Sequence, residues 1–246
     1  MCFIGHGAFG IITKPIWCNY FAVFGIGHEL AYWLMPLVGG IDILLGLSLL
    51  FYPIRAVAAW LVFWGVVTAS LRPLSGEPVA EMIERAGNYG APLALLLLSQ
   101  TGASQKLWSK LDPDTQPNDR RYRLVGLTLR IAVAMLLLGH GWLNLIEKKG
   151  LLAQYTSLGF SNPAQVAHIA GIFESVAALA VLVRPVRPLL LAFFVWKMGT
   201  ELFYPKWELF EWVERGGSYG CILALWMALG HVPVRNTASA KTNFAV

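Results

Sequence analysis

Apolar residues gather into long runs along this chain, and short polar stretches separate them. Four runs in the second half are long enough for membrane-spanning helices, at residues 124–146, 164–183, 186–204 and 211–231. The first half contains three more at 31–52, 55–72 and 80–100, and a shorter apolar stub at 2–13. A spanning helix needs about 20 mainly apolar residues. The pattern predicts an all-α integral membrane protein with about seven to eight transmembrane helices.

The two halves carry matching residues in the same order. Gly-His-Gly occurs at 5–7 and again at 139–141, and Glu-Arg-x-Gly-x-Tyr-Gly occurs at 84–90 and again at 214–220. An offset of 132 residues also matches the pairs Gly39/Gly171, Asp42/Glu174, Trp64/Trp196 and Thr68/Thr200. Such self-similarity predicts a tandem repeat of two four-helix units. An even number of spans per unit predicts parallel repeats about a pseudo-twofold axis along the membrane normal.

The repeat divides the chain into four expected segments. These are a first unit at 1–101, a linker at 102–123, a second unit at 124–232 and a polar tail at 233–246. The stub at 2–13 matches only the later part of 124–146, so the first helix is shortened. A misassigned start, a truncation and a packed half-helix all remain open as explanations.

Composition agrees with a membrane location. Hydrophobic residues make up 57% of the chain and charged residues 13%, with a mean hydropathy of +0.58, whereas soluble domains carry about 25% charged residues. The net charge of +5 forms no basic stripe, so we expect no nucleic-acid partner. The three cysteines form no C-x-x-C pair, so we expect neither a redox dithiol nor a metal site. A modest excess of Lys and Arg on the side that holds the linker and both termini favours cytoplasmic termini in a bacterial inner membrane.

Ionisable residues within the second-half spans mark a candidate site. His140, Glu174 and Lys197 each lie ten residues from an arginine at a helix end, which places them about 15 Å deep. We expect them to meet near the midplane, with Glu201 one turn beyond Lys197. Such residues indicate a functional site by default, here with catalytic or ligand-binding roles. A polar cluster that only fixes helix register is the alternative.

The first half keeps only part of this set. His6 and Asp42 match His140 and Glu174, but glycine and alanine stand where the second half has Lys197 and Glu201. We therefore expect the second half to be the working half and the first half to be a scaffold.

Repeated aromatic and charged residues add candidate ligand contacts. Trp64 and Trp196 are expected near midplane, as core residues or walls of a ligand pocket. Tyr89 and Tyr219 are expected near the outer ends of the spans, as interfacial anchors or as hydrogen-bond partners of a quinone head group. The Glu-Arg pairs of the repeated motif are expected to be solvated at the outer surface. A haem b bound by His6 and His140 would require the two halves to share it across the pseudo-axis.

Several of these motifs resemble a known family. Arg130 followed by Gly-His-Gly-Trp-Leu-Asn-Leu at 139–145 resembles the first helix of DoxX-like membrane proteins, although Asn144 stands near a position where lysine is common. Phe173-Glu174 with Arg184 resembles the second helix of that family, and the segment at 40–46 is similar to the same element. The resemblance covers almost the whole chain outside the linker and implies two fused DoxX-like four-helix units.

DoxX and DoxD relatives include membrane subunits of quinone-linked oxidoreductases, so the resemblance implies a quinone-dependent subunit that works with a protein partner in a membrane redox complex. The absence of cysteine pairs, iron–sulfur spacing and nucleotide motifs means that this partner must supply or remove electrons. A non-enzymatic scaffold or assembly factor is one alternative, suggested by small-residue faces at Gly39-Gly40 and Gly216-Gly217. A small-solute transporter is another, although no broken helix pair is visible in the sequence.

Overall fold

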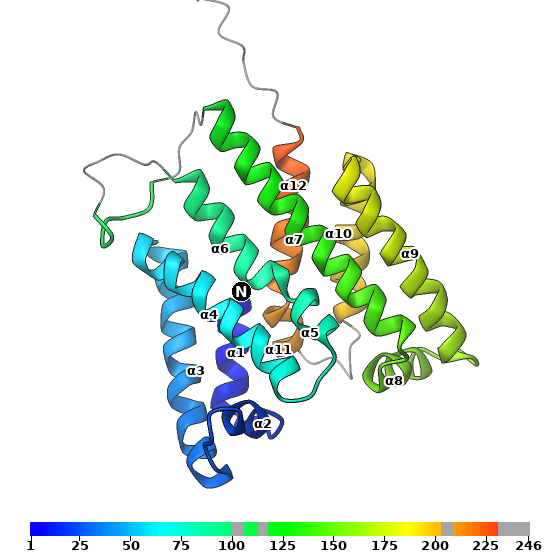
Figure 1. Cartoon of the computed structure of the whole chain (residues 1–246), viewed down its shortest axis with the longest axis horizontal. Helices are drawn as coiled ribbons and strands as arrows, with labels where there is room; N and C mark the ends of the chain where they lie inside the picture. The colour runs from blue at the N-terminus through cyan, green and yellow to red at the C-terminus, as the bar shows by residue number, and fades with distance from the viewer. Residues whose placement is uncertain (100–105, 113–117, 203–208, 231–246) are drawn as a thin grey trace, which may run out of the picture.

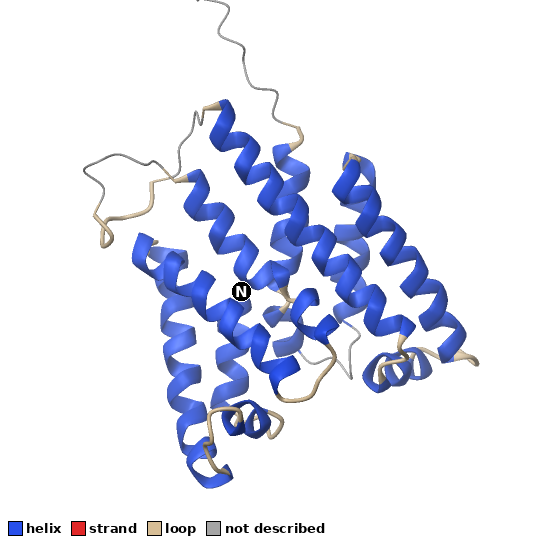
Figure 2. Ribbon diagram, viewed as in Figure 1, coloured by secondary structure: helices blue, strands red, loops and turns tan. Residues whose placement is uncertain are grey.

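Helices form the architecture of the computed structural model, which describes residues 1–99, 106–112, 118–202 and 209–230 (Figure 2). The helices described in the first half are α1 (Cys2–Ile11), α2 (Trp17–Ala22), α3 (His28–Phe51), α4 (Arg55–Leu74), α5 (Val79–Glu84) and α6 (Ala86–Leu98). Those in the second half are α7 (Asp119–Leu145), α8 (Lys149–Ser157), α9 (Pro163–Val183), α10 (Arg187–Leu202), α11 (Leu209–Glu214) and α12 (Gly216–Ala228) (Figure 1). The predicted all-α class is confirmed.

Membrane-spanning character is clearest in four of the described helices. By length and apolar composition, α3, α4, α7 and α9 can each cross a bilayer. The apolar helices α1 and α12 are shorter, and the residues that follow α10 lie outside the described part of the chain. The total of about seven to eight spans therefore stays a prediction.

Some element boundaries differ from those that the sequence predicts. Helix α7 begins at Asp119 rather than at 124, because the Asn118 side chain caps it and accepts a 2.9 Å hydrogen bond from the Arg121 amide. The short helices α2 and α8 were not predicted, since neither is long enough to give a clear periodic signal. Much of the linker, the end of the predicted 186–204 span and the 233–246 tail lie outside the described residues.

Two long helix pairs pack through glycines. Helix α1 packs against α3, and α7 packs against α9 in the same manner (Figure 1). Gly7 meets the carbonyl of Gly39 in the first pair, and a Cβ on Gly141 would lie 2.9 Å from the carbonyl oxygen of Gly171 in the second. Glycine at these crossings lets the two backbones approach closely.

Two predicted spans are interrupted helices. The predicted span at 80–100 divides into α5 and α6 at Arg85, and the span at 211–231 divides into α11 and α12 at Arg215. Both arginines leave helical geometry in the same way, with φ/ψ of −86°/13° and −77°/4°. The sequence-based expectation of no broken helix pair was therefore wrong. The break falls inside the Glu-Arg motif of each half, beside the glycines that follow it.

Each broken helix packs on the other half of the chain. Helix α5 packs on α7, and α11 packs on α1. A Cβ on Gly139 would lie 2.7 Å from Glu84 Cα, and a Cβ on Gly5 would lie 2.7 Å from Glu214 Cα. Helices α6 and α12 also pack together, where Gly87 meets Ser218. The two Glu-Arg motifs are therefore exchanged between the halves, and each completes the polar centre of the other.

Candidate functional site

A buried ionic cluster lies where α7, α9 and α10 meet. Glu174 bridges the cluster, because one carboxylate oxygen lies 2.5 Å from His140 Nδ1 and the other lies 3.1 Å from Lys197 Nζ. Lys197 is only 2% exposed, and Glu174 is equally buried. The structure thus brings together the three residues that their spacing along the sequence predicted to lie at the same depth in the membrane. Their function remains a prediction.

Glu201 extends the cluster toward α12. Its Oε1 atom lies 3.8 Å from Lys197 Nζ and 3.9 Å from His140 Nε2. Its second oxygen lies 3.0 Å from Arg215 Nε. Arg215 also donates to Glu84 Oε1 at 2.7 Å. A residue from the first half therefore completes the second-half centre, which we call the lysine-filled centre (Glu84, His140, Glu174, Lys197, Glu201 and Arg215).

Asn144 and Tyr155 hold the histidine end of this centre. Asn144 is fully buried, and its amide lies 3.2 Å from His140 Nδ1 and 3.5 Å from Glu174. Tyr155, on α8, donates to Asn144 Oδ1 at 2.8 Å. Burial raises the pKa of Tyr155 to about 12, and the nearby Glu174 and Glu201 carboxylates contribute less in the same direction. The hydroxyl therefore stays protonated and keeps donating, a role that the sequence did not indicate.

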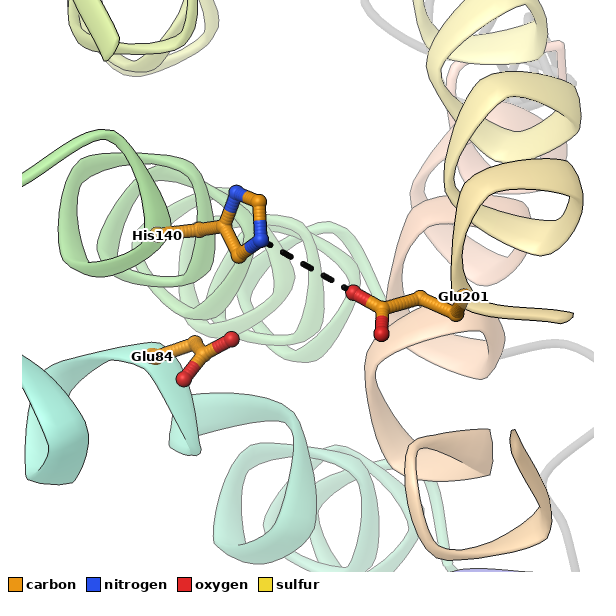
Figure 3. A group of neighbouring side chains, drawn as sticks. All are labelled: Glu84, His140 and Glu201. Carbon is orange, nitrogen blue, oxygen red and sulfur yellow. Dashed lines mark ion pairs between the residues drawn. The ribbon is translucent and has the colours of Figure 1, made fainter. Parts of the chain in front are cut away.

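Glu84, His140 and Glu201 also form a candidate metal-binding group, since one donor atom from each lies within 4.8 Å of the others. Figure 3 shows the three side chains pointing toward one another from three different elements. The Arg215 guanidinium already contacts both carboxylates, at 2.7 Å and 3.0 Å. A divalent ion would have to displace the Arg215 guanidinium. These three residues therefore fit a network of ion pairs between side chains better than a metal site.

The corresponding centre of the first half is open rather than filled. His6 Nδ1 lies 2.7 Å from Asp42 Oδ2, as His140 does from Glu174, and its ring lies 4.5 Å from that of Trp17. No lysine enters this centre, because Gly65 and Ala69 stand at the positions of Lys197 and Glu201.

A partly open cavity with a volume of about 80 Å³ lies beside His6 and Ala69. We call it the first-half cavity. Aromatic residues from α2 and α4 line much of it, together with His6 and polar residues from both halves. Its lining comprises His6, Trp17, Tyr20, Phe21, Phe24, Val38, Trp64, Thr68, Ala69, Leu71, Arg72, Arg85, Asn88 and Glu214. The expectation that the first half is a scaffold stays a prediction.

Glu214 is the unusual member of this lining. It is 7% exposed, and among the described residues its carboxylate makes no direct hydrogen bond or ion pair within 4.0 Å. The matching residue Glu84 pairs with Arg215, whereas Arg85 turns instead to Glu81, at 2.7 Å. The exchange of motifs thus places one unpaired buried carboxylate at the first-half cavity.

A smaller polar cavity lies between the two centres. Its lining consists of three matched pairs from the two halves, namely Glu84 and Glu214, Arg85 and Arg215, and Asn88 and Ser218. Three of these residues also line the first-half cavity. The smaller cavity therefore adjoins both polar centres.

Several sequence-based expectations need correction. The motif acids were expected to be solvated, but Glu84 is 3% exposed and belongs to the buried network. Trp64 lines the first-half cavity as expected, whereas Trp196 is 52% exposed and lines neither cavity. Tyr219 is buried rather than interfacial, and Tyr89 packs against the main hydrophobic core. The repeated Glu-Arg motif was the available signal for Glu84 and Glu214, but no sequence pattern showed that the halves exchange it.

The fold and the buried ionic centres define an all-α, multi-pass membrane protein. Residues 125–199 match the family model described as DoxX. The matched segment lies in the second half and contains His140, Glu174 and Lys197. Assignment of the first half to the same family stays a prediction. No curated protein and no solved structure matches the chain at a significant level.

Proposed function

We infer that this protein is the membrane subunit of a quinone-linked oxidoreductase system, and that it binds a quinone or a similar small hydrophobic ligand between its helices. The observation that carries this inference is the first-half cavity. Aromatic walls and a few convergent polar groups are typical of small-molecule sites.

The cavity suits a ring-shaped ligand with polar substituents. Trp17, Phe21 and Trp64 supply flat apolar surfaces, against which rings pack favourably. His6, which pairs with Asp42, and Glu214 supply polar groups to the lining. A histidine beside a carboxylate can exchange protons, as quinone reduction and oxidation require. The ligand site thus moves from the second half, where the sequence predicted it, to the first.

Electrons have to come from a protein partner. All three cysteines are free and buried, at positions 2, 18 and 221, and the sequence carries no nucleotide motif. The proposal therefore includes a redox partner in the same membrane, with this chain as the ligand-binding component. A bacterial inner membrane with cytoplasmic termini belongs to the same proposal.

Mass spectrometry of small molecules extracted from gently purified protein tests the proposal. We expect a quinone at about one molecule per chain, because the proposal places one ligand in the first-half cavity. Absence of any quinone, together with stable co-purification of a membrane protein, would favour a scaffold instead. The glycines that suggested a scaffold pack against other helices of the same chain, since Gly39 packs on Gly7 and Gly217 packs on Gly87.

A transporter is the second candidate, and the interrupted helices at Arg85 and Arg215 favour it. Interrupted spans around polar centres are common in secondary transporters. Uptake of a labelled solute into proteoliposomes, abolished by Glu214→Gln, would support this function over quinone binding.

A further inference from the structure

We propose that the first-half cavity selects the reduced form of its ligand, so that a hydroquinone binds there in preference to the quinone. This inference rests on the proposed quinone site and specifies which redox form that site accepts. It follows from three observations about the hydrogen-bonding groups that the cavity presents.

The first observation is the unpaired carboxylate. Glu214 is more than nine-tenths buried, lines the cavity and makes no direct hydrogen bond or ion pair among the described residues. Arg72 and Arg85 line the same cavity and favour its ionised form. An ionised carboxylate accepts hydrogen bonds but cannot donate them. A ligand that covers Glu214 must therefore donate a hydrogen bond to it.

The second observation concerns His6. Its Nδ1 atom lies 2.7 Å from Asp42, and a carboxylate in that position selects the tautomer that carries its proton on Nδ1. The Nε2 atom is then left for a ligand, as an acceptor in the neutral ring or as a donor in the imidazolium. Glu214 is therefore the acceptor on which the selection rests.

The third observation is what fills the matching space in the second half. There the Lys197 ammonium, which only donates hydrogen bonds, lies 3.1 Å from Glu174 and 3.8 Å from Glu201. Gly65 and Ala69 stand at the positions of Lys197 and Glu201, so they supply no such donor to the first half, and Ala69 lines the cavity.

These groups discriminate between the two redox forms. A hydroquinone hydroxyl both donates and accepts, so it can donate its one proton to Glu214 and also accept from a cavity arginine. A quinone carbonyl only accepts, so a bound quinone would cut Glu214 off from water without replacing the lost hydrogen bonds. An unsatisfied buried charged group is costly enough to predict at least about a tenfold difference in affinity.

Anaerobic titration of the purified full chain with tetramethylhydroquinone and with tetramethylbenzoquinone, followed by calorimetry, tests the proposal. We expect the hydroquinone to bind at least about tenfold more tightly. In Glu214→Gln the amide can donate to a carbonyl, so the preference should fall toward unity, while Glu214→Asp should retain it. Glu211→Gln is the matched control on the same helix, because Glu211 pairs with Lys14 and does not line the cavity.

The possible results separate the two proposals. Equal or tighter binding of the quinone would overturn the selectivity and leave the quinone site in place. Failure of both compounds to bind would overturn the quinone site itself. Tighter binding of butylammonium than of the hydroquinone would also overturn the selectivity, because it would make the cavity a cation site. A preference unchanged in Glu214→Gln would also overturn the selectivity, because Glu214 would not be the group that accepts from the hydroquinone.

Discussion

Single residues decide which of the two matching centres is open. Lys197 crosses the space between α10 and α9 and ends on Glu174, so its own ammonium satisfies that buried carboxylate. At the matching position Gly65 has no side chain, and Ala69 replaces the carboxylate of Glu201 by a methyl group. Ala69 lines the first-half cavity, whereas a Cβ on Gly65 would lie 3.2 Å from Tyr89.

Replacement of Lys197 tests whether the second-half centre is structural. Lys197→Met should lower the free energy of unfolding by about 3–5 kcal/mol, because it leaves Glu174 buried without its cation. Lys197→Met combined with Glu174→Gln should recover part of this loss, which thermal or denaturant unfolding in detergent can measure. A double variant that is fully active and differs only in stability would show that this centre has no catalytic role.

Helix breaks and glycine contacts decide how the elements assemble. Both interrupted helices break at the arginine of the Glu-Arg motif, and the glutamate before each break meets a glycine of the opposite half. A side chain on Gly139 or Gly5 would collide with backbone rather than with a movable side chain. These glycines therefore fix the depth at which Glu84 and Glu214 enter the two centres.

Gly139→Ala should destabilise the protein by about 1–3 kcal/mol, as expected for overpacking. Its Cβ would lie within 2.9 Å of backbone atoms in α5. Gly126→Ala is the matched control on α7, since nothing lies within 4 Å of its added Cβ, and it should gain about 0.5–1 kcal/mol from helix propensity. Unfolding midpoints of the two variants in one detergent provide the comparison, and equal stability would contradict the tight crossing.

The elements that could be predicted from the sequence are those marked by a local, regular pattern of residues. Apolar runs predicted the long helices, and ten-residue spacings brought His140, Glu174 and Lys197 together correctly. The breaks at Arg85 and Arg215 were missed because each lies within a run of apolar character that continues on both sides. The burial of Glu84 was missed because its partner Arg215 is supplied by the other half, and that exchange is a property of tertiary packing.

The two halves of the molecule are similar in architecture but differ in the residues at their polar centres. Each half supplies a His-carboxylate pair and receives the Glu-Arg motif of the other half. The smaller polar cavity lies between the two centres and is lined equally by both halves. Glu84, Glu214 and the two motif arginines are therefore the residues that connect the two centres in space. The proposed function assigns ligand binding to the first half and structural support to the second.

The most direct test of this account is ligand titration of a variant whose first-half cavity is filled. Ala69→Phe places a large side chain on the cavity wall, and Ala59→Phe places the same side chain on an exposed position of the same helix. Tetramethylhydroquinone should bind the wild type and Ala59→Phe with the same saturable affinity, and Ala69→Phe should lose at least about tenfold in affinity. Unchanged affinity in a folded Ala69→Phe variant would contradict the assignment of the ligand to the first-half cavity.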